Sequence, residues 1–508
     1  MYKLRKSVGF KSLMLLTSII IFTACNNPVK PESYKVLLIT NNDLAEAWQA
    51  YADWKKSIGK STKIITVSDI SKDYNATNIQ EKIRLCVRDY IENYGVKWVV
   101  LGGDSQPNDK GVVPGGHITV HQQEPKGIPT DIIYLSPTNW DADNDGIYGE
   151  FKDDQEAITY PDGSIGLGRI PVRTREDVIA FTEKVIAYEA NYPTGSFASN
   201  MVYTCTDQPA YAKVRNSWDG YLSKVWNGNS KRFFSSETPW DEEGKLGSYE
   251  LSAENLVSLI NNKTTSKMHI HGHGHLPAWL LEGKSTFIGD HVQQLNNEGA
   301  YPLITTVSCN TGEYDSDKDP SIVEQMIRKP KGGSVAVVAP IRTGKPHFSD
   351  RNDFKLMVLE GKLDGTTHTM TRYWMAGMND NATTGEALMK AKSEMIADAK
   401  NSEAYHLCIC EINLLGDPTL DMRSAAPKTP KLEVEKQLTL GKNKLEVSTA
   451  ISGCTVCVWK ENDGIYEIAK ADDTGKAAFN LEIASAGDMV VSASGINVNS
   501  AVTKIYVK

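Results

Sequence analysis

Two reactive side chains in this 508-residue chain stand beside glycines. His273 lies between Gly272 and Gly274, and Cys309 follows later at the end of an apolar run. A thiol near an imidazole can become a thiolate, which is the nucleophile of cysteine peptidases. We therefore predict that Cys309 attacks the substrate and that His273 serves as general base and then as general acid.

The apolar runs before these residues predict how they are positioned. Residues 267–271 and 303–307 are short and apolar, which is typical of buried strands. Open α/β sheets place their sites at the carboxyl ends of the strands, and His273 and Cys309 would both lie there. The glycines beside His273 have no Cβ, so a backbone amide could approach a substrate carbonyl closely.

These two motifs belong to an ordered set of segments. Gly272-His273-Gly274 and Ser308-Cys309-Asn-Thr-Gly312-Glu-Tyr314 resemble the gingipain-like cysteine peptidases, which are related in fold to caspases. Further matching segments occur in the family's order between residues 33 and 422, namely 53–55, 98–104, 166–172, 184–189 and 413–418. The resemblance implies a caspase-like, parallel-sheet α/β catalytic region in two subdomains.

The resemblance also implies a mechanism. It assigns an endopeptidase reaction through an acyl-enzyme on Cys309, with an oxyanion hole made by the backbone amides of Gly274 and Cys309. Family members carry an acidic residue after the strand that opens the second subdomain, and Asp207 matches that position. The alternative for Asp207 is a turn residue that binds local backbone.

Three other functions remain open from the sequence. A transpeptidase of the same fold would use the same residues. His269, His271, His273 and His275 alternate, so on one strand they would share a face and could hold zinc in a metal-dependent hydrolase. A binding protein with a degenerate site is a further alternative, which the intact His, Cys and glycines disfavour.

An acidic segment predicts a structural calcium site. Asp-x-Asp-x-Asp-Gly places carboxylates at alternate positions, which can converge on one hard cation. Lys152 occupies the place of the usual acidic residue, so the segment is not an EF-hand, and a solvated acidic turn is the alternative. The candidate ligands are Asp141, Asp143, Asp145, Ile147 and Glu150.

The N-terminus resembles a bacterial lipoprotein signal. A basic segment, residues 1–11, precedes an apolar run, residues 12–22, that is too short to remain as a spanning helix. Phe22-Thr-Ala-Cys25 resembles a lipobox, so we expect residues 1–24 to be removed, Cys25 to be lipidated and 25–33 to form a tether. The expected location is the cell envelope, at the outer membrane, and the sequence does not indicate which face of that membrane. The alternative for the N-terminus is an ordinary signal peptide without lipidation.

The length and the pattern predict three folded parts. Strands and helices alternate over 34–195 and again over 196–425, which indicates a parallel α/β sheet in each half. Among the predicted helices, Gly95 should close the one over 78–93 and Thr174 should cap the one over 175–190; others are expected over 353–360 and 384–399. Residues 426–508 change to short strands separated by turns, and we predict an immunoglobulin-like β-sandwich there. The net charge of -8 without a basic stripe argues against nucleic acid, so the expected partners are proteins or peptides.

Cysteine pairing and specificity are less constrained. Cys454 and Cys457 form a lone Cys-x-x-Cys, for which a local disulfide or no bond are the options. Asp219 is a candidate for selecting a basic substrate residue, but nearby Arg215 weakens that case. A further candidate, the acidic stretch after the nucleophile, is equally typical of a solvated turn; it contains Asp315, Asp317 and Asp319.

Overall fold

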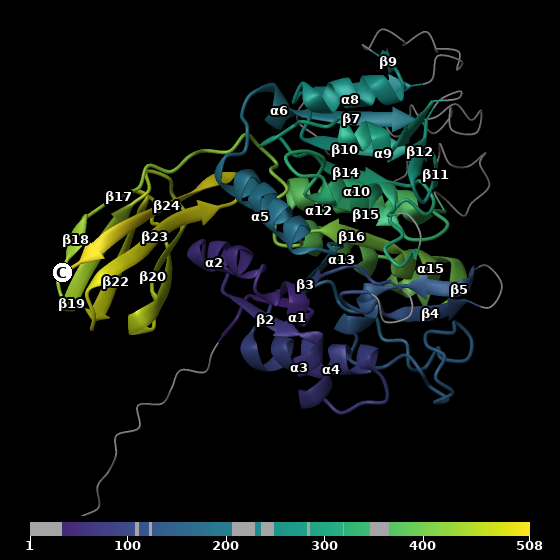
Figure 1. Ribbon diagram of the computed structural model, residues 1–508, viewed down its shortest axis with the longest axis horizontal. Helices are drawn as coiled ribbons and strands as arrows, with labels where there is room; N and C mark the ends of the chain where they lie inside the picture. Colours follow the sequence, from purple (N-terminus) through teal and green to yellow (C-terminus); the bar gives the residue numbers. More distant parts are fainter. Residues whose placement is uncertain are drawn as a thin grey trace, which may run out of the picture. The chain divides into compact units, whose positions relative to one another are not determined.

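An eleven-stranded sheet is the framework of the larger part of the chain (Figure 1). The computed structural model describes residues 33–106, 111–120, 124–205, 229–234, 248–281, 285–317, 320–345 and 365–508. In spatial order the strands are β2 (Thr62–Thr66), β1 (Val36–Thr40), β3 (Trp98–Gly102), β6 (Gly166–Ile170), β16 (Ile412–Gly416), β15 (Ala336–Pro340), β14 (Leu303–Thr306), β10 (Lys267–His271), β7 (Asn200–Cys205), β8 (Asn229–Phe234) and β9 (Ser248–Glu250).

The late strand β16 joins the two halves of this sheet. It pairs in parallel with β6, through Leu415 and Arg169, and antiparallel with β15, from Ile412 to Gly416. Every other neighbouring pair in the order is parallel. The sequence pattern predicts an α/β sheet in each half but did not indicate β16, so it did not reveal that the halves share one sheet and one hydrophobic core.

Helices lie on both faces of the sheet (Figure 1). Thr174 caps the helix that follows β6 as predicted, because its side chain accepts from the Asp177 amide while the Asp177 carboxylate accepts from the Thr174 amide. Gly95 ends another helix in the left-handed region, with φ +78°, also as predicted. The helices are α1 (Asn42–Ala45), α2 (Gln49–Ser57), α3 (Val67–Asp73), α4 (Ile79–Tyr94), α5 (Arg175–Ala190), α6 (Ser196–Ser199), α8 (Ala253–Asn261), α9 (Gly289–Gln293), α10 (Ile322–Arg328), α12 (Gly365–Asn379), α13 (Thr384–Ser393), α14 (Ile396–Ala399) and α15 (Glu403–Glu411).

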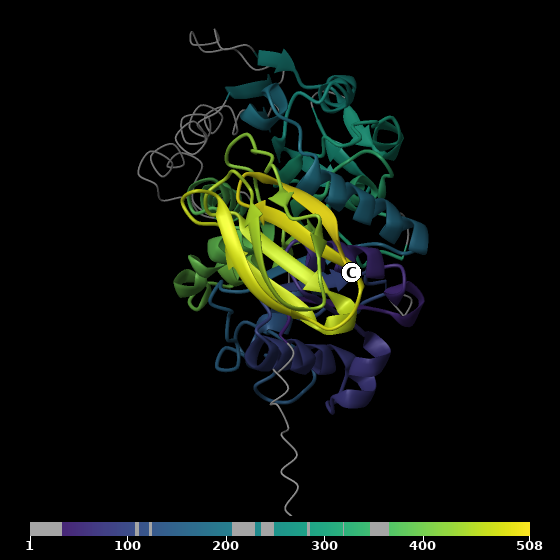
Figure 2. The ribbon, with the colours of Figure 1, turned by 90° about the vertical axis from the view of Figure 1, so that its left-hand side faces the viewer.

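The last part of the chain is a β-sandwich with its own core (Figure 2). One sheet contains β17 (Glu433–Val434), β19 (Gly441–Ser448) and β22 (Lys476–Ile483). The other contains β18 (Gln437–Leu438), β24 (Val498–Val507), β23 (Gly487–Gly495), β20 (Thr455–Lys460) and β21 (Ile465–Lys470). Residues of β22 alternate between exposed and buried, as a strand with one face on a core must. The predicted immunoglobulin-like module is confirmed, and Cys454 and Cys457 are free thiols.

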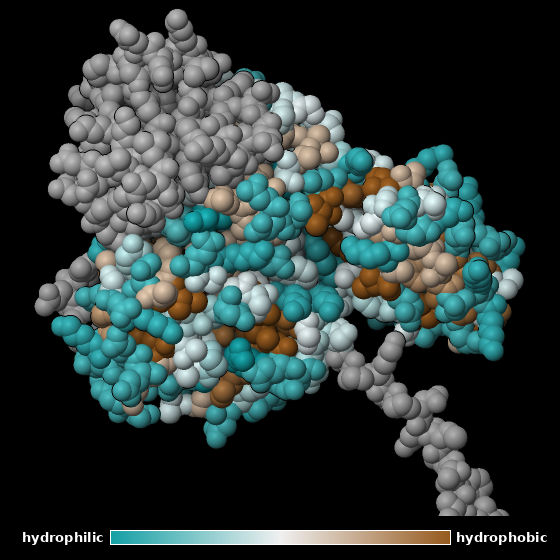
Figure 3. Space-filling view, turned by 180° about the vertical axis from the view of Figure 1, so that it is seen from behind, coloured by the Kyte–Doolittle hydropathy of each residue, from teal (hydrophilic) through white to brown (hydrophobic). Residues whose placement is uncertain are grey.

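The surface carries mainly hydrophilic residues with small apolar patches on the face shown in Figure 3. Within the part of the chain that the structure describes, no helix has both the length and the apolar character needed to span a membrane.

Candidate active site

The strands that precede the two reactive residues are neighbours in the sheet. β10 and β14 pair in parallel, with His269 opposite Thr305, so they end at the same edge. Beyond the paired residues, the Val307 amide donates to the Ile270 carbonyl at 3.2 Å. The prediction of two adjacent buried strands is confirmed, although β14 ends at Thr306.

The glycine after His273 brings the two motifs into contact. His273 begins β11 (His273–His275), which pairs antiparallel with β12 (Ala278–Leu280); β12 in turn pairs with β13 (Thr286–Ile288). A Cβ placed on Gly274 would lie 2.8 Å from the Cys309 carbonyl oxygen and 2.5 Å from Thr311 Cγ2. Real Cβ atoms do not come so close, and therefore only glycine fits between β11 and the turn that carries Cys309.

Contacts from the loop after β15 and a hydrogen bond within the turn hold Cys309 in place. Asn310 has φ +59°, in the left-handed region, and its amide donates to the Arg342 carbonyl at 2.7 Å. The Thr311 hydroxyl donates to the Ser308 carbonyl at 2.8 Å, which closes the turn. The Cys309 thiol donates to the Gly344 carbonyl, with Sγ and O 3.7 Å apart. The segment after β15 therefore contacts both the backbone and the sulfur of the nucleophile position.

Exposure separates Cys309 from the other thiols. Among the cysteine side chains that the structure describes, Cys309 is half-buried and the others are buried. Burial raises the pKa of Cys86 and of Cys410 to about 12, which leaves them protonated and unreactive. His273 is exposed, so solvent and substrate can reach both members of the pair.

The four alternating histidines do not form one array. His269 and His271 are buried in β10, whereas His273 and His275 are exposed on β11, beyond a break at Gly272. The His269 ring lies 2.8 Å from the Thr305 hydroxyl and stacks on Tyr203, and burial lowers its pKa well below the usual value. The expectation of a single four-histidine strand is wrong, because the chain leaves the large sheet after His271.

The acidic segment converges as predicted for three of its residues. Within the described residues, the carboxylates of Asp141, Asp143 and Asp145 form the one group of metal-binding side chains whose ligand atoms lie within 4.8 Å of one another. Glu150 is buried outside that group, and the Ile147 amide donates to Asp145 Oδ1 at 2.7 Å. Buried Asp154 holds the segment by accepting from the amides of Ala142 and Glu150, at 2.6 and 3.0 Å. These atoms are hard oxygen donors, which suits calcium.

One of the acidic residues after the nucleophile is not in a solvated turn. The Asp315 carboxylate accepts a hydrogen bond from each terminal nitrogen of Arg342, with Nη1–Oδ1 at 2.9 Å and Nη2–Oδ2 at 2.7 Å. Burial would raise the pKa of Asp315, but the nearby His117 imidazole and the hydrogen bonds and charge of Arg342 lower it to about 2. Asp317 is exposed, as expected of a turn, and Asp319 lies outside the described residues.

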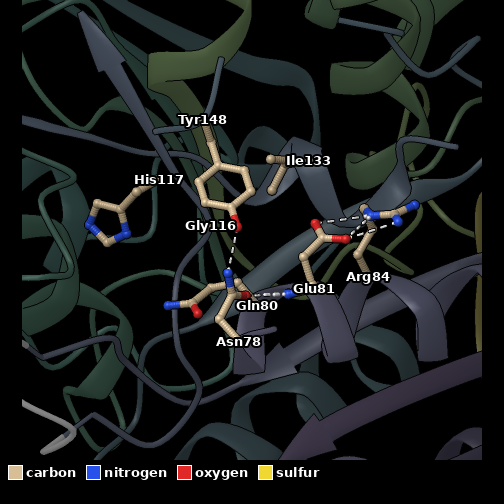
Figure 4. Close-up of a pocket in the computed structure, with 8 residues that line it drawn as sticks. All are labelled: Asn78, Gln80, Glu81, Arg84, Gly116, His117, Ile133 and Tyr148. Carbon is tan, nitrogen blue, oxygen red and sulfur yellow. Dashed lines mark hydrogen bonds and ion pairs between the residues drawn. The ribbon is translucent and has the colours of Figure 1, made fainter. Parts of the chain in front are cut away.

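A pocket of about 170 Å³ lies beside this region (Figure 4). Sequence analysis did not indicate it, since its lining residues come from separate elements. His117 connects the pocket to the nucleophile loop, because its Nε2 atom is 3.9 Å from Asp315 Oδ2. Figure 4 shows Tyr148 directed at Asn78 and the Glu81–Arg84 ion pair at the side. The lining residues are Asn78, Gln80, Glu81, Arg84, Gly116, His117, Ile133 and Tyr148.

Three further candidate residues fall in parts of the chain that the structure does not describe. Asp207, Asp219 and the lipidation candidate Cys25 all lie outside the described residues, as does the helix predicted over 353–360.

A parallel α/β sheet with a glycine-flanked histidine and a partly exposed cysteine at one edge is the arrangement of a cysteine peptidase. The model of peptidase family C25 matches residues 29–423. The chain belongs to this family, the gingipain family of cysteine peptidases.

Solved structures of the family have the same fold. The Arg-specific cysteine proteinase gingipain R is 18% identical, with a TM-score of 0.69, over 94% of this chain and 99% of that one. The complex of the pro- and mature domains of RgpB from Porphyromonas gingivalis is also 18% identical, with a TM-score of 0.66, over 93% and 100% of the two chains. A search of curated protein sequences finds no significant match.

Proposed function

We propose that the chain is an exported endopeptidase that hydrolyses internal peptide bonds through a thioester on Cys309. The observation that carries this proposal is the contact of Gly274 with the Cys309 turn, since it brings the backbone after His273 to the one half-buried thiol among the described cysteines. The family supports peptide or protein substrates.

In this reaction the Cys309 sulfur attacks the carbonyl carbon of the scissile bond, and His273 takes the thiol proton. His273 then gives a proton to the leaving amine as the carbon–nitrogen bond breaks. Water, activated by the same imidazole, cleaves the thioester and restores the thiol. The amides of Gly274 and Cys309 would bind the oxyanion, and Asp207 would orient the imidazole.

Product analysis on a mixed peptide library tests the reaction and identifies the preferred residue before the cut. We expect internal cleavage by the wild type and a loss of about 10⁴-fold or more with Cys309→Ala, the scale on which removal of a nucleophile acts. Near-normal turnover by Cys309→Ala, with unchanged folding, would end the cysteine-peptidase proposal. Adding an amine nucleophile distinguishes the transpeptidase alternative, which would join that amine to the new carboxyl end.

Calcium is proposed as a structural ion rather than a reactant. The Asp141, Asp143 and Asp145 carboxylates crowd within 4.8 Å, and a cation between them would relieve their mutual repulsion. They lie in the segment that leads into β6, in the first α/β half of the chain, which carries neither Cys309 nor His273.

Export with a lipid anchor is proposed from the N-terminal motif at Cys25. Cys25→Ser should yield protein without lipid that is released from membranes, as measured by detergent-phase partitioning. If the Cys25→Ser protein still entered the detergent phase, the anchor would have to be elsewhere.

A further inference from the structure

The turn after the nucleophile and the loop after β15 are joined by a buried ion pair. Asp315 lies six positions after Cys309, and Arg342 follows the end of β15. Both side chains are largely buried, with exposed fractions of 12% and 5%. Two parallel hydrogen bonds, at 2.9 and 2.7 Å, connect the guanidinium to both carboxylate oxygens. Such a fork fixes orientation as well as distance.

The backbone of the same arginine holds the residue next to the nucleophile. The Arg342 carbonyl accepts the Asn310 amide at 2.7 Å, and the Gly344 carbonyl accepts the Cys309 thiol at 3.7 Å. Asn310 is in the left-handed region, which costs energy for a residue with a Cβ and persists only where surrounding contacts enforce it. Any shift of Arg342 would therefore move the Cys309 sulfur and the peptide bond beside it.

The ion pair is braced from other elements. His117, which comes from β4 (His117–Val120), places Nε2 3.9 Å from Asp315 Oδ2. The Glu313 carboxylate lies 3.8 Å from the Arg342 guanidinium and accepts a hydrogen bond from the side-chain amide of Asn310 at 3.3 Å. The contacts thus join the turn that follows Cys309 to the loop after β15 and to β4.

We infer that the Asp315–Arg342 ion pair is a clasp that positions the Cys309 nucleophile, and that both side chains are positioning residues for catalysis. This inference rests on the proposed role of Cys309. The sulfur and the Cys309 amide must both meet the substrate carbonyl, so a small displacement of the turn lowers the chemical rate more than it lowers substrate binding. Lysine cannot replace Arg342, because a single ammonium does not reproduce the planar fork.

The test compares Asp315→Asn and Arg342→Lys with the wild type. A matched control, Asp421→Asn, breaks a second arginine–carboxylate ion pair of similar burial, with exposed fractions of 2% for Arg423 and 18% for Asp421. Each protein is titrated with a thiol-alkylating reagent to count reactive Cys309, and kcat and KM are measured per titrated site on a cleaved library peptide. The alkylation rate of Cys309 is also followed against pH, and melting temperature is recorded.

We expect both clasp variants to lose about 10- to 100-fold in kcat per titrated site with KM little changed, the scale of a small displacement of a reacting group. Their pH profile of Cys309 alkylation should differ from the wild type. Asp421→Asn should melt at a lower temperature but keep wild-type kcat and profile. If the clasp has only a structural role, Asp315→Asn and Arg342→Lys should behave like the control, with normal kcat and normal alkylation of Cys309. That result would overturn the inference.

Two further comparisons distinguish failure of the inference from misfolding of a variant and from failure of the proposed function. If Asp315→Asn does not fold, Arg342→Lys, which keeps the charge, decides alone, and its normal behaviour overturns the inference. If alkylation of Cys309 leaves wild-type hydrolysis intact, the proposed function fails. The alkylation profiles still report on the clasp in that case, since they measure the thiol and not turnover.

Discussion

Two strands of the same sheet are each followed by a reactive side chain, one buried in ion pairs and the other accessible. Asp104 follows β3 after Gly102 and Gly103, and Cys309 follows β14. Asp104 is 1% exposed and forms ion pairs with Arg173 and Arg328, while its carbonyl accepts the Val113 amide. Cys309 is half-buried and lies against a glycine of a second motif.

The comparison shows that position at a carboxyl edge is not enough to make a site. The side chain after β3 is neutralised by two arginines and closed off from solvent, so it stabilises the fold. The turn after β14 keeps its side chain accessible and receives the backbone after His273, because Gly274 has no Cβ. The predictions below test each side of this difference, beginning with the largest effect.

Gly274→Ala should reduce kcat by about 10²- to 10³-fold, the loss seen when one oxyanion-hole donor is removed. The added methyl group would lie 2.8 Å from the Cys309 carbonyl and Ser308 Cβ, so β11 must move away from the nucleophile turn. Initial rates on a cleaved library peptide measure the effect.

The control for this substitution is Gly495→Ala in the sandwich. A Cβ there has its nearest neighbour, Val498 Cγ2, at 3.5 Å, which is an ordinary contact, and kcat should be unchanged. Normal turnover by folded Gly274→Ala would mean that close contact between the two motifs is not required for catalysis.

Asp104→Asn should cost about 3 kcal/mol of unfolding free energy, because Asp104 is buried and the change removes one carboxylate partner of the partly exposed Arg173 and Arg328. Turnover per folded molecule should stay at the wild-type level. Denaturant unfolding and initial rates, measured on the same samples, check both statements. A large loss of kcat without loss of stability would instead assign Asp104 to the chemistry.

The local elements of this fold follow closely from the sequence. Helix α5 begins after Thr174 and α4 ends at Gly95, since both caps depend on neighbouring residues only. The stretch predicted as one helix over 384–399 is instead split into α13 and α14, with a turn at Glu394 and buried Met395. Strand β16 was missed because its placement between β6 and β15 depends on contacts far apart in the chain.

The candidate site divides in the same way. Cys309, His273 and Gly274 could be predicted, because each motif is a short run with a glycine at a fixed position. The clasp could not, since Asp315, Arg342 and His117 come from three separate segments and none has a distinctive sequence neighbourhood. The acidic segment could be predicted in part. Its spacing predicted that Asp141, Asp143 and Asp145 form a group, but the hydrogen bond that buried Asp154 accepts from the Ala142 amide appears only in the structure.

Calcium should stabilise the first α/β half of the chain, to which Asp104 belongs, without changing the chemistry of the other half. A cation that binds only the native state raises stability by about 2.7 kcal/mol at a hundredfold excess over its dissociation constant. A chelator should therefore lower the melting temperature, and Asp143→Ala combined with Asp145→Ala should abolish that sensitivity. Thiol alkylation should stop hydrolysis whether or not the ion is present. Unchanged melting of metal-stripped protein on chelation would remove the calcium proposal, whereas immediate loss of turnover with unchanged melting would move the metal to the reaction itself.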